Sequence, residues 1–399
     1  MAKILLAWEF GSGMGHLMTL CSLGAALAKR GHQVTAVVRN LPRANELFAH
    51  TGISCMAAPM RPYPELLPFP TIHSMAHVLG NVGFANGQHL YEQLSAWTAL
   101  IERIQPDLVI ADYAPTALLA LRGKPIRKVN VGVGFSCPPD TSPMPYWGTQ
   151  LNGAGLGEQI RADEAKMLAC INQVLENLKR PALERVSQIF NDVDEVFLAT
   201  YPEFDHYGPR QTVRYWGHWN LGTGARPDWP KVQGAKVFAY VKPFPGLELL
   251  LRILAEAKLP TIMLASDIPL PLQQRYASPI LRFESDLLDM RRVAAECDLA
   301  ILNAGHGTTL TMLMAAKPCL LIPLFIEQVI TAKKAEGFGA ARLVSKTGNG
   351  LLEALRDLLE LPKYPTNARI FASRCAGFPI DRQVIEVVNH LEKLAIMDN

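Results

Sequence analysis

The sequence predicts an α/β protein with two domains, each built on a parallel β-sheet covered by helices. Short apolar strands alternate with helical segments through residues 3–133, and a second series of the same kind begins near residue 236. This alternation is typical of βαβ units. The chain has 399 residues, 49% of them apolar and 19% charged, which is enough for two buried cores of roughly 200 residues each.

The first half contains strands that are apolar along their whole length, as expected of strands buried on both faces. The pattern predicts strands over 3–8, 33–38, 53–57, 107–111, 127–133 and 195–200, and helices over 17–30, 42–50, 88–104, 115–121 and 158–180. Residues 134–150 are rich in Pro and Ser and predict a long loop. Such a loop is either functional or a plain surface excursion, and Phe135 within it is a candidate acceptor-site residue.

The second half begins after a segment rich in turn-forming residues, 218–231, which is the predicted linker. The predicted domains are therefore 1–220 and 221–378, followed by an amphipathic helix within 379–399. Further elements are predicted as strands over 236–241, 261–265, 299–302 and 319–323, with a helix over 246–257.

Composition excludes several classes of protein. The net charge is +3 and no basic run is present, so nucleic acid is not the expected partner. The seven cysteines are dispersed without CxxC or metal-ligand spacing, which is typical of a reducing cytoplasm. The N-terminal apolar run is too short for a signal peptide, and no segment has the roughly 20 apolar residues of a membrane span. We therefore expect a cytoplasmic protein.

A glycine-containing loop follows the first strand, and it ends in a histidine at the start of a helix. The run Gly11-Ser12-Gly13-Met14-Gly15-His16 does not have the spacing of a dinucleotide fingerprint, and the second strand ends without an acid. A histidine at the carboxyl end of a parallel strand is well placed to act as a general base. The alternative is that His16 caps the helix or contacts a phosphate. Gly13 and Gly15 are candidate acceptor-site residues.

The most informative stretch is 299–339. An apolar strand, 299–302, leads into Asn303-Ala304-Gly305-His306-Gly307-Thr308-Thr309, a helical run and a second strand, before Glu327-Gln328 and Gly-Phe-Gly. Small residues at a strand-to-helix turn let an anion approach backbone N–H groups at the positive end of the helix. The turn therefore predicts a phosphate site that includes Gly305, Gly307, Thr308 and Thr309.

The order of these parts resembles the donor-binding signature of the UDP-glycosyltransferase-like family, in particular its bacterial antibiotic-type members. Residues 196–207 and 213–220 resemble the family's segment before the interdomain linker. The resemblance implies the GT-B fold: two Rossmann-like domains facing across a cleft, with the last helix crossing back to the first. It implies inverting, metal-independent transfer of a hexose from a UDP- or dTDP-sugar to a nucleophile on a small acceptor, without a cofactor.

The resemblance also implies roles for individual residues. His16 matches the base that deprotonates the acceptor, and Asp112, at the end of a later strand, matches its partner acid; the alternative for Asp112 is a helix N-cap. Glu327 and Gln328 match a pair that contacts donor-sugar hydroxyls, although acids and amides are also common at helix starts. Lys242 is a candidate diphosphate contact and Phe283 a candidate base contact; a solvated lysine and a core phenylalanine are the alternatives.

The sequence departs from the family pattern at two positions. Asn303 takes the place of a histidine, and Thr311 that of an acid, while His306 stands three residues after the expected histidine. We expect Asn303 to donate an amide hydrogen bond to a phosphate oxygen, so that diphosphate binding survives. His306 either replaces the lost contact or fills space.

Three other interpretations stay open. The first is an epimerase of the same architecture, and the second is a non-catalytic protein that binds a nucleotide sugar or a partner. The third is a membrane-docked transferase with a lipid acceptor, for which residues 64–84 supply apolar material; a buried helix is the other interpretation of that segment. Asp192-Val193-Asp194 resembles a metal-binding triplet but precedes a strand, so we interpret it as a solvated turn.

Overall fold

The computed structural model describes all residues except 12, 62–65, 148–154, 220–223, 379 and 397–399. The chain divides into two compact units. The N-terminal unit comprises Met1–Trp216 together with Arg382–Asn399, and the C-terminal unit comprises Gly217–Asp381. The domain boundaries predicted from sequence fall at residues 220, 221 and 379, which lie outside the described residues.

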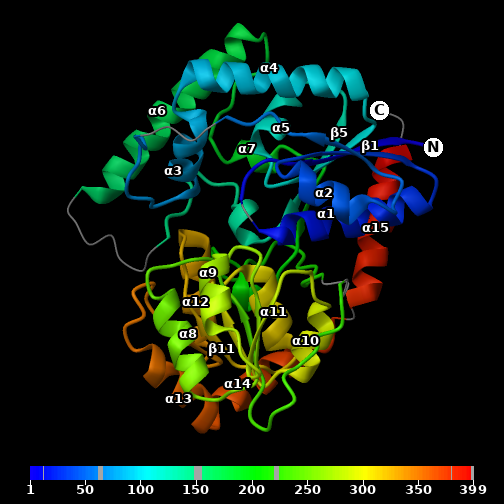
Figure 1. The fold of residues 1–399 in the computed structure, drawn as a ribbon. Helices are drawn as coiled ribbons and strands as arrows, with labels where there is room; N and C mark the ends of the chain where they lie inside the picture. Colours follow the sequence, from blue (N-terminus) through cyan, green and yellow to red (C-terminus); the bar gives the residue numbers. More distant parts are fainter. Residues whose placement is uncertain (12, 62–65, 148–154, 220–223, 379, 397–399) are drawn as a thin grey trace. The chain divides into compact units, whose positions relative to one another are not determined.

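The described residues of the N-terminal unit form a six-stranded parallel sheet with the order β3-β2-β1-β4-β5-β6 (Figure 1). The two central strands β1 and β4 pair in register, with Ile4 opposite Leu108 and Trp8 opposite Asp112. The bounds of the strands are β1 Lys3–Trp8, β2 Gln33–Val38, β3 Ser54–Ala57, β4 Leu108–Asp112, β5 Arg127–Gly132 and β6 Glu195–Leu198. Each predicted strand of this half is present, within three residues at either end.

Helices cover both faces of this sheet. Figure 1 shows α1 and α2 on one side and α4 and α5 on the other. Asn40 caps α2 and Asn86 caps α4, each by accepting a backbone N–H in the first turn. The helices are α1 Met14–Lys29, α2 Leu41–Phe48, α3 Met75–Leu79 with a π-helical turn Gly80–Phe84, α4 Gly87–Ile104, α5 Pro115–Ala120, α6 Leu156–Asn177 and α7 Gln188–Asn191, with 3₁₀ turns at Gly134–Ser136 and Pro202–Phe204.

The last helix, α15 Ile380–Ile396, packs on the N-terminal unit beside the end of α1 (Figure 1). Arg30 donates hydrogen bonds to the Glu392 carboxylate at 2.6 Å and to the Asn389 side chain at 2.8 Å. His32 Nε2 lies 3.1 Å from the other Glu392 oxygen. The apolar face of α15 is buried through Val384, Val387, Val388, Leu391 and Ala395. The predicted return of this helix to the first half of the chain is therefore present.

The described residues of the C-terminal unit form a second six-stranded parallel sheet, with the order β12-β11-β10-β7-β8-β9. Helices α8 and α13 bury one apolar cluster against the sheet, which includes Leu250, Leu254, Met263, Ile301 and Leu355. Helices α10, α11 and α14 pack together on the other side (Figure 1).

The strands of this unit are β7 Val237–Tyr240, β8 Thr261–Leu264, β9 Leu281–Glu284, β10 Leu299–Leu302, β11 Cys319–Leu321 and β12 Ala341–Leu343. Its helices are α8 Leu247–Glu256, α9 Leu270–Tyr276, α10 Met290–Glu296, α11 His306–Met314, α12 Ile326–Gly337, α13 Leu351–Glu360 and α14 Lys363–Cys375. Two parallel sheets flanked by helices confirm the predicted fold class.

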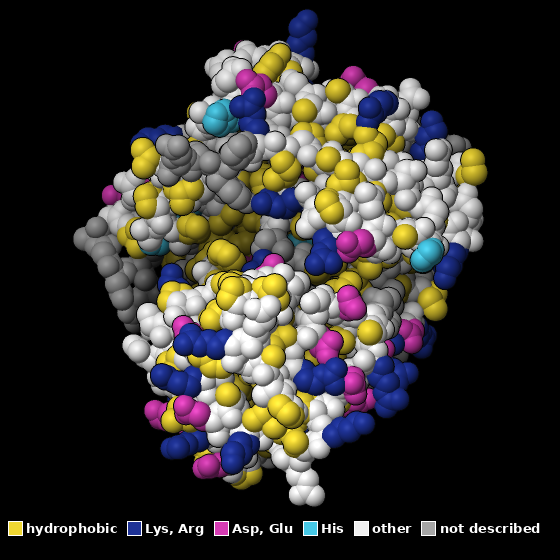
Figure 2. Space-filling model, viewed as in Figure 1, with side chains coloured by type: hydrophobic (Ala, Val, Ile, Leu, Met, Phe, Trp, Pro, Cys, Tyr) yellow, Lys and Arg dark blue, Asp and Glu magenta, His cyan; other side chains and the backbone are white. Residues whose placement is uncertain are grey.

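Residues 64–84 contain both buried and exposed apolar side chains. Met75, Leu79 and Phe84 are buried, as the helical interpretation of this segment predicts, whereas Leu66 is 88% exposed. Residues 64 and 65 lie outside the described part. Among the described residues no helix has the length and hydropathy needed to cross a bilayer. On the face shown in Figure 2, Lys and Arg side chains are interspersed with Asp and Glu.

Candidate functional site

Each sheet has one point at which the strand order reverses. In the N-terminal unit it lies between β1 and β4, and in the C-terminal unit between β7 and β10. Open parallel sheets bind ligands outside the carboxyl ends of their strands at such switch points. His16 follows β1 and Asp112 ends β4 at the first switch point, and Lys242 and Asn303 follow β7 and β10 at the second. Four of the residues predicted from sequence therefore lie at the two switch points.

His16 and Asp112 are hydrogen-bonded to each other at the first switch point. His16 is the third residue of α1, Asp112 is the last residue of β4, and His16 Nδ1 lies 2.8 Å from Asp112 Oδ1. The carboxylate is buried, whereas the imidazole retains 16% of its side-chain exposure. A carboxylate accepts the hydrogen of Nδ1, which leaves the lone pair on Nε2. The pair therefore has the orientation of a general base and its partner.

Two residues that the sequence interpretation passed over shape this pair. Gly11 has φ +82°, and a Cβ atom there would lie 2.5 Å from His16 Nε2. Tyr113, directly after Asp112, is a non-glycine residue with φ +49°. Backbone strain of this kind is concentrated at functional sites. The only signal in the sequence was the glycine content of the first loop.

A run of aromatic rings extends from His16. Its imidazole lies 6.0 Å from the Tyr113 ring, which contacts Phe135 at 6.0 Å, and Phe135 stacks on Trp147 at 4.8 Å. Trp147 in turn lies 5.9 Å from Tyr207. Trp147 Nε1 and Tyr207 Oη are buried and have no hydrogen-bond partner in the described part of the chain. Burial raises the pKa of Tyr207 well above its usual value, so its hydroxyl stays protonated.

The predicted acceptor residues differ in how near they lie to the pair. Phe135 belongs to the aromatic run, in a 3₁₀ turn after β5. Gly13 is the N-cap residue of α1 with ordinary φ, and a Cβ atom would meet open space at Gly15. In this loop it is Gly11, and not Gly13 or Gly15, that approaches a functional side chain.

In the C-terminal unit the predicted phosphate turn is present at the start of α11. Gly305 is the N-cap residue, and the first helical hydrogen bond runs from Thr309 N–H to Gly305 C=O. The N–H groups of Gly307 and Thr308 precede that bond and have no carbonyl partner within the helix. The Thr309 hydroxyl is fully buried without a hydrogen-bond partner among the described residues. Ala304 has φ +58°, a second strained non-glycine position at a switch point.

Asn303 uses its amide on the protein backbone. Its Oδ1 accepts the Lys242 N–H at 2.6 Å, and its Nδ2 donates to the Ile322 C=O at 2.8 Å. The side chain therefore connects the carboxyl ends of β7, β10 and β11. The amide oxygen and one amide hydrogen are engaged in this way, and the predicted phosphate contact stays a prediction for the second amide hydrogen.

Thr311, at the position where the family has an acid, has hydrogen-bond contacts with a backbone carbonyl and with a histidine. Its hydroxyl donates to the Gly307 C=O at 2.9 Å, and His218 Nε2 lies 3.0 Å from the same oxygen. Loss of hydration lowers the pKa of His218 to about 4. His306, the first residue of α11, is buried. His218 stands in the predicted linker, and no motif or periodicity in that segment points to it.

The remaining donor candidates have structural contacts of their own. Glu327 and Gln328 lie in the first turn of α12, and Gln328 Oε1 accepts the Leu324 N–H at 2.7 Å. Phe283 lies in the edge strand β9 and packs, partly buried, against the apolar cluster under α8 and α13. Part of the ring therefore packs on this cluster, and the contact of Phe283 with the base stays a prediction.

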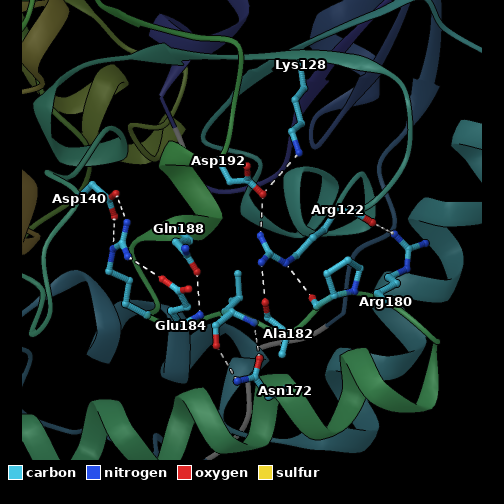
Figure 3. A network of polar contacts seen from close by, with 12 residues as sticks. Arg122, Lys128, Asp140, Asn172, Arg180, Ala182, Glu184, Gln188 and Asp192 are labelled. Carbon is cyan, nitrogen blue, oxygen red and sulfur yellow. Dashed lines mark hydrogen bonds and ion pairs between the residues drawn. The ribbon is translucent and has the colours of Figure 1, made fainter. Parts of the chain in front are cut away.

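Asp192 and Asp194, which resemble a metal-binding triplet, are paired with cations. Asp192 lies 2.6 Å from Arg122 and 3.9 Å from Lys128 (Figure 3). Asp194 lies 2.8 Å from Arg127. Arg122 also donates to the Ala182 carbonyl, which joins the segment after α6 to the end of α5. Within the described ranges no group of three His, Cys, Asp or Glu side chains has the geometry to hold a metal ion.

Comparison with known proteins supports the fold. No model of a known protein family matches the sequence. A segment of 74 residues is 36% identical to ugt-60 of Caenorhabditis elegans, which is named as a UDP-glucuronosyltransferase; the match covers 18% of this chain and 14% of that protein.

Solved structures match over nearly the whole chain. The glycotransferase of kitacinnamycin matches with a TM-score of 0.69 at 16% identity, over 98% of both chains. The calicheamicin glycosyltransferase CalG4 has a TM-score of 0.69 at 18% identity, over 99% of both. The Streptomyces sp. SF2575 glycosyltransferase SsfS6, complexed with thymidine diphosphate, has a TM-score of 0.65 at 20% identity, over 98% of this chain and 100% of that one. The chain therefore has the GT-B fold of the antibiotic glycosyltransferases.

Proposed function

We propose that the chain is a glycosyltransferase that moves a sugar from a nucleoside diphosphate to a hydroxyl, or another nucleophile, of a small-molecule acceptor. The observation that carries the proposal is the 2.8 Å hydrogen bond between His16 Nδ1 and Asp112 Oδ1 at a switch point. It leaves Nε2 as the only ring atom that can take up a proton, and the buried carboxylate stabilises the imidazolium that results.

The reaction follows from these groups. His16 Nε2 removes the acceptor proton while the acceptor oxygen forms a bond to the anomeric carbon. The bond from that carbon to the diphosphate breaks, and the electron pair leaves with the nucleoside diphosphate. Attack from the face opposite the leaving group inverts the anomeric configuration.

The leaving diphosphate is the natural ligand for the start of α11. The N–H groups of Gly307 and Thr308 and the positive end of the helix stabilise the charge that develops on it, without a metal ion. The nucleotide sugar is a co-substrate, and no other cofactor is proposed. Thymidine diphosphate in the complex of SsfS6, a protein of the same fold, supports UDP or dTDP as the carrier.

The acceptor is proposed to contact the aromatic run beside His16. Trp147 Nε1 and Tyr207 Oη have no hydrogen-bond partner within the described residues, and buried polar groups usually find one. A small acceptor with an apolar body and a polar substituent would satisfy them.

The test is turnover of His16→Ala and Asp112→Asn with UDP- and dTDP-sugars over a panel of acceptors. We expect His16→Ala to lose roughly a hundredfold to ten-thousandfold in kcat, the contribution of a positioned base. His50→Ala, a change at an exposed histidine outside this site, serves as the control. Near-normal turnover of His16→Ala would refute the base assignment.

The same assay separates the alternatives. Consumption of the donor in water alone, without an acceptor, would indicate an epimerase. Nucleotide binding without turnover across the whole panel would indicate a binding protein. A thermal shift with UDP or dTDP, but not with NAD, would identify the ligand class.

A further inference from the structure

His218 lies directly over the first turn of α11. A Cβ atom on Gly307 would stand 3.1 Å from His218 Cε1, so glycine at this position lets the imidazole approach the helix closely. Nε2 of the ring is 3.0 Å from Thr311 Oγ1, one turn further along the helix. The ring therefore borders the N-terminal turn in which the phosphate site is proposed.

The hydrogen bonds around Thr311 fix the tautomer of His218. Thr311 has one hydroxyl hydrogen, and it is directed to the Gly307 C=O at 2.9 Å. Its oxygen can therefore only accept from the imidazole, which puts the ring hydrogen on Nε2. The lone pair is on Nδ1, which makes no hydrogen bond to any described residue.

The charge of the ring is fixed as well. Burial lowers the pKa of His218 to about 4, so the ring is neutral at pH 7. The positive end of the helix dipole also disfavours a second proton on the ring at this position. At neutral pH, His218 therefore presents a hydrogen-bond acceptor beside the turn, and not a cation.

An acceptor in this place selects its ligand. A diphosphate oxygen is itself an acceptor and would be repelled by the Nδ1 lone pair, whereas a hydroxyl can donate to it. The Thr311 hydroxyl is already engaged, so it cannot take the role of the carboxylate that the sequence lacks at this position. The Nδ1 atom of His218, one bond away from the ring carbon that approaches Gly307, can accept such a hydrogen.

We propose that His218 Nδ1 accepts a hydrogen bond from a hydroxyl of the nucleotide-sugar donor, with Thr311 holding the ring in the required tautomer. The inference rests on the proposed function. The hydroxyl belongs either to the ribose or to the transferred sugar, and the binding experiment distinguishes these two sources.

The experiment measures the dissociation constants of the full-length protein for UDP, 2′-deoxy-UDP, 3′-deoxy-UDP and UDP-glucose by calorimetry. His218→Phe keeps a ring without the lone pair, and His50→Phe is the matched control on an exposed histidine. If the ribose is the source, His218→Phe binds UDP roughly fivefold more weakly than the parent protein does, as the loss of one net hydrogen bond predicts. The affinity for the deoxy analogue that lacks the bonded hydroxyl should then be the same in both proteins. If the transferred sugar is the source, the loss appears with UDP-glucose alone.

Thr311→Val tests the role of the threonine. The valine cannot accept a hydrogen bond from Nε2, so the ring hydrogen is free to move to Nδ1. The affinity should then fall for the same ligands as in His218→Phe. Because both changes act through one atom, the double variant should lose no more than His218→Phe alone. Nitrogen chemical shifts of the ring should show the hydrogen on Nε2 in the parent protein and on Nδ1 in Thr311→Val.

Three results would overturn the inference. His218→Phe could bind all four ligands like the parent protein, or it could lose affinity for all four equally, which would indicate general distortion. Tighter UDP binding at pH 6 than at pH 8 that disappears in His218→Phe would show a cation on phosphate instead. If the parent protein bound neither the four ligands nor dTDP, the proposed function itself would be refuted, and this result is distinct from the three above.

Discussion

The backbone of Gly11 lies against the imidazole of His16. An added Cβ atom would come within 2.5 Å of Nε2, the ring atom that faces away from Asp112. Trp8 stacks on the ring with centroids 5.5 Å apart. The imidazole is therefore held by a hydrogen bond at Nδ1, by an aromatic face and by a glycine at Nε2.

Gly11→Ala is expected to reduce kcat by roughly a hundredfold, the effect of displacing a reacting group by about 1 Å. The methyl group must push the imidazole away from its position, and φ +82° adds backbone strain. Gly52→Ala is the matched control, because Gly52 has φ +75° but open space around its Cβ position. The two variants should lose similar stability in thermal unfolding. Equal kcat values in both would contradict the steric argument.

A buried carboxyl group behind the same loop makes stability depend on pH. Glu9 is fully buried after β1, and its Oε2 accepts the Thr116 N–H at 3.0 Å. Burial raises the pKa of Glu9 from 4.5 to about 7. Because the folded value lies above the unfolded one, this group's contribution to stability is complete below pH 4.5 and is lost as the pH rises through 7.

Glu9→Gln removes this dependence while keeping the shape of the side chain. Relative to the parent protein, the variant should gain stability between pH 5 and pH 8, by an amount on the order of 3 kcal/mol. Urea midpoints of both proteins, measured in steps of one pH unit over this range, provide the comparison. If the urea midpoints of the two proteins changed with pH in parallel, the pKa of Glu9 would not be raised by folding.

Asn303 should contribute more to folding than to ligand binding. Asn303→Leu leaves the Lys242 N–H and the Ile322 C=O without their partners, at a cost of about 1–3 kcal/mol each. The melting temperature of the C-terminal unit should fall clearly. Asn303→Asp keeps the acceptor for Lys242 but sets a carboxylate oxygen against the Ile322 carbonyl, so it should also destabilise. Unchanged melting with weaker UDP binding would instead support the phosphate contact expected from sequence.

The strands were predictable because their pattern is local. Buried parallel strands are apolar along their length, and the segments 3–8, 33–38 and 299–302 coincide with β1, β2 and β10. The π-helical turn Gly80–Phe84 was not predictable. Phe69 lies against Gly80, and the Asn81 amide bonds both backbone groups of Phe69, contacts that depend on the folded chain.

The residues of the candidate site also fall into two groups: those placed by the strand topology and those placed by contacts of the folded chain. His16 follows β1 and Asp112 ends β4, and these two strands are neighbours at a switch point, so the proximity of the two residues follows from topology. His218 pairs with a residue 93 positions away, from a segment without periodicity. The Asn303 amide contacts Lys242 after β7 and Ile322 after β11. No sequence pattern predicts which backbone groups a side-chain amide will bind.

The last helix should stabilise the N-terminal unit mainly through its apolar face. Leu391 is fully buried in α15, whereas Ile385 of the same helix is 56% exposed. Leu391→Ala should cost about 2–5 kcal/mol, the range for a buried leucine, and Ile385→Ala should cost little. Hydrogen exchange should increase in peptides of β1, α1 and α15 in the first variant, and not in those of β7 and α11, because α15 packs on the N-terminal unit. Equal exchange in both variants would show that the ion pairs of Arg30 and His32 with Glu392, rather than burial, hold the helix in place.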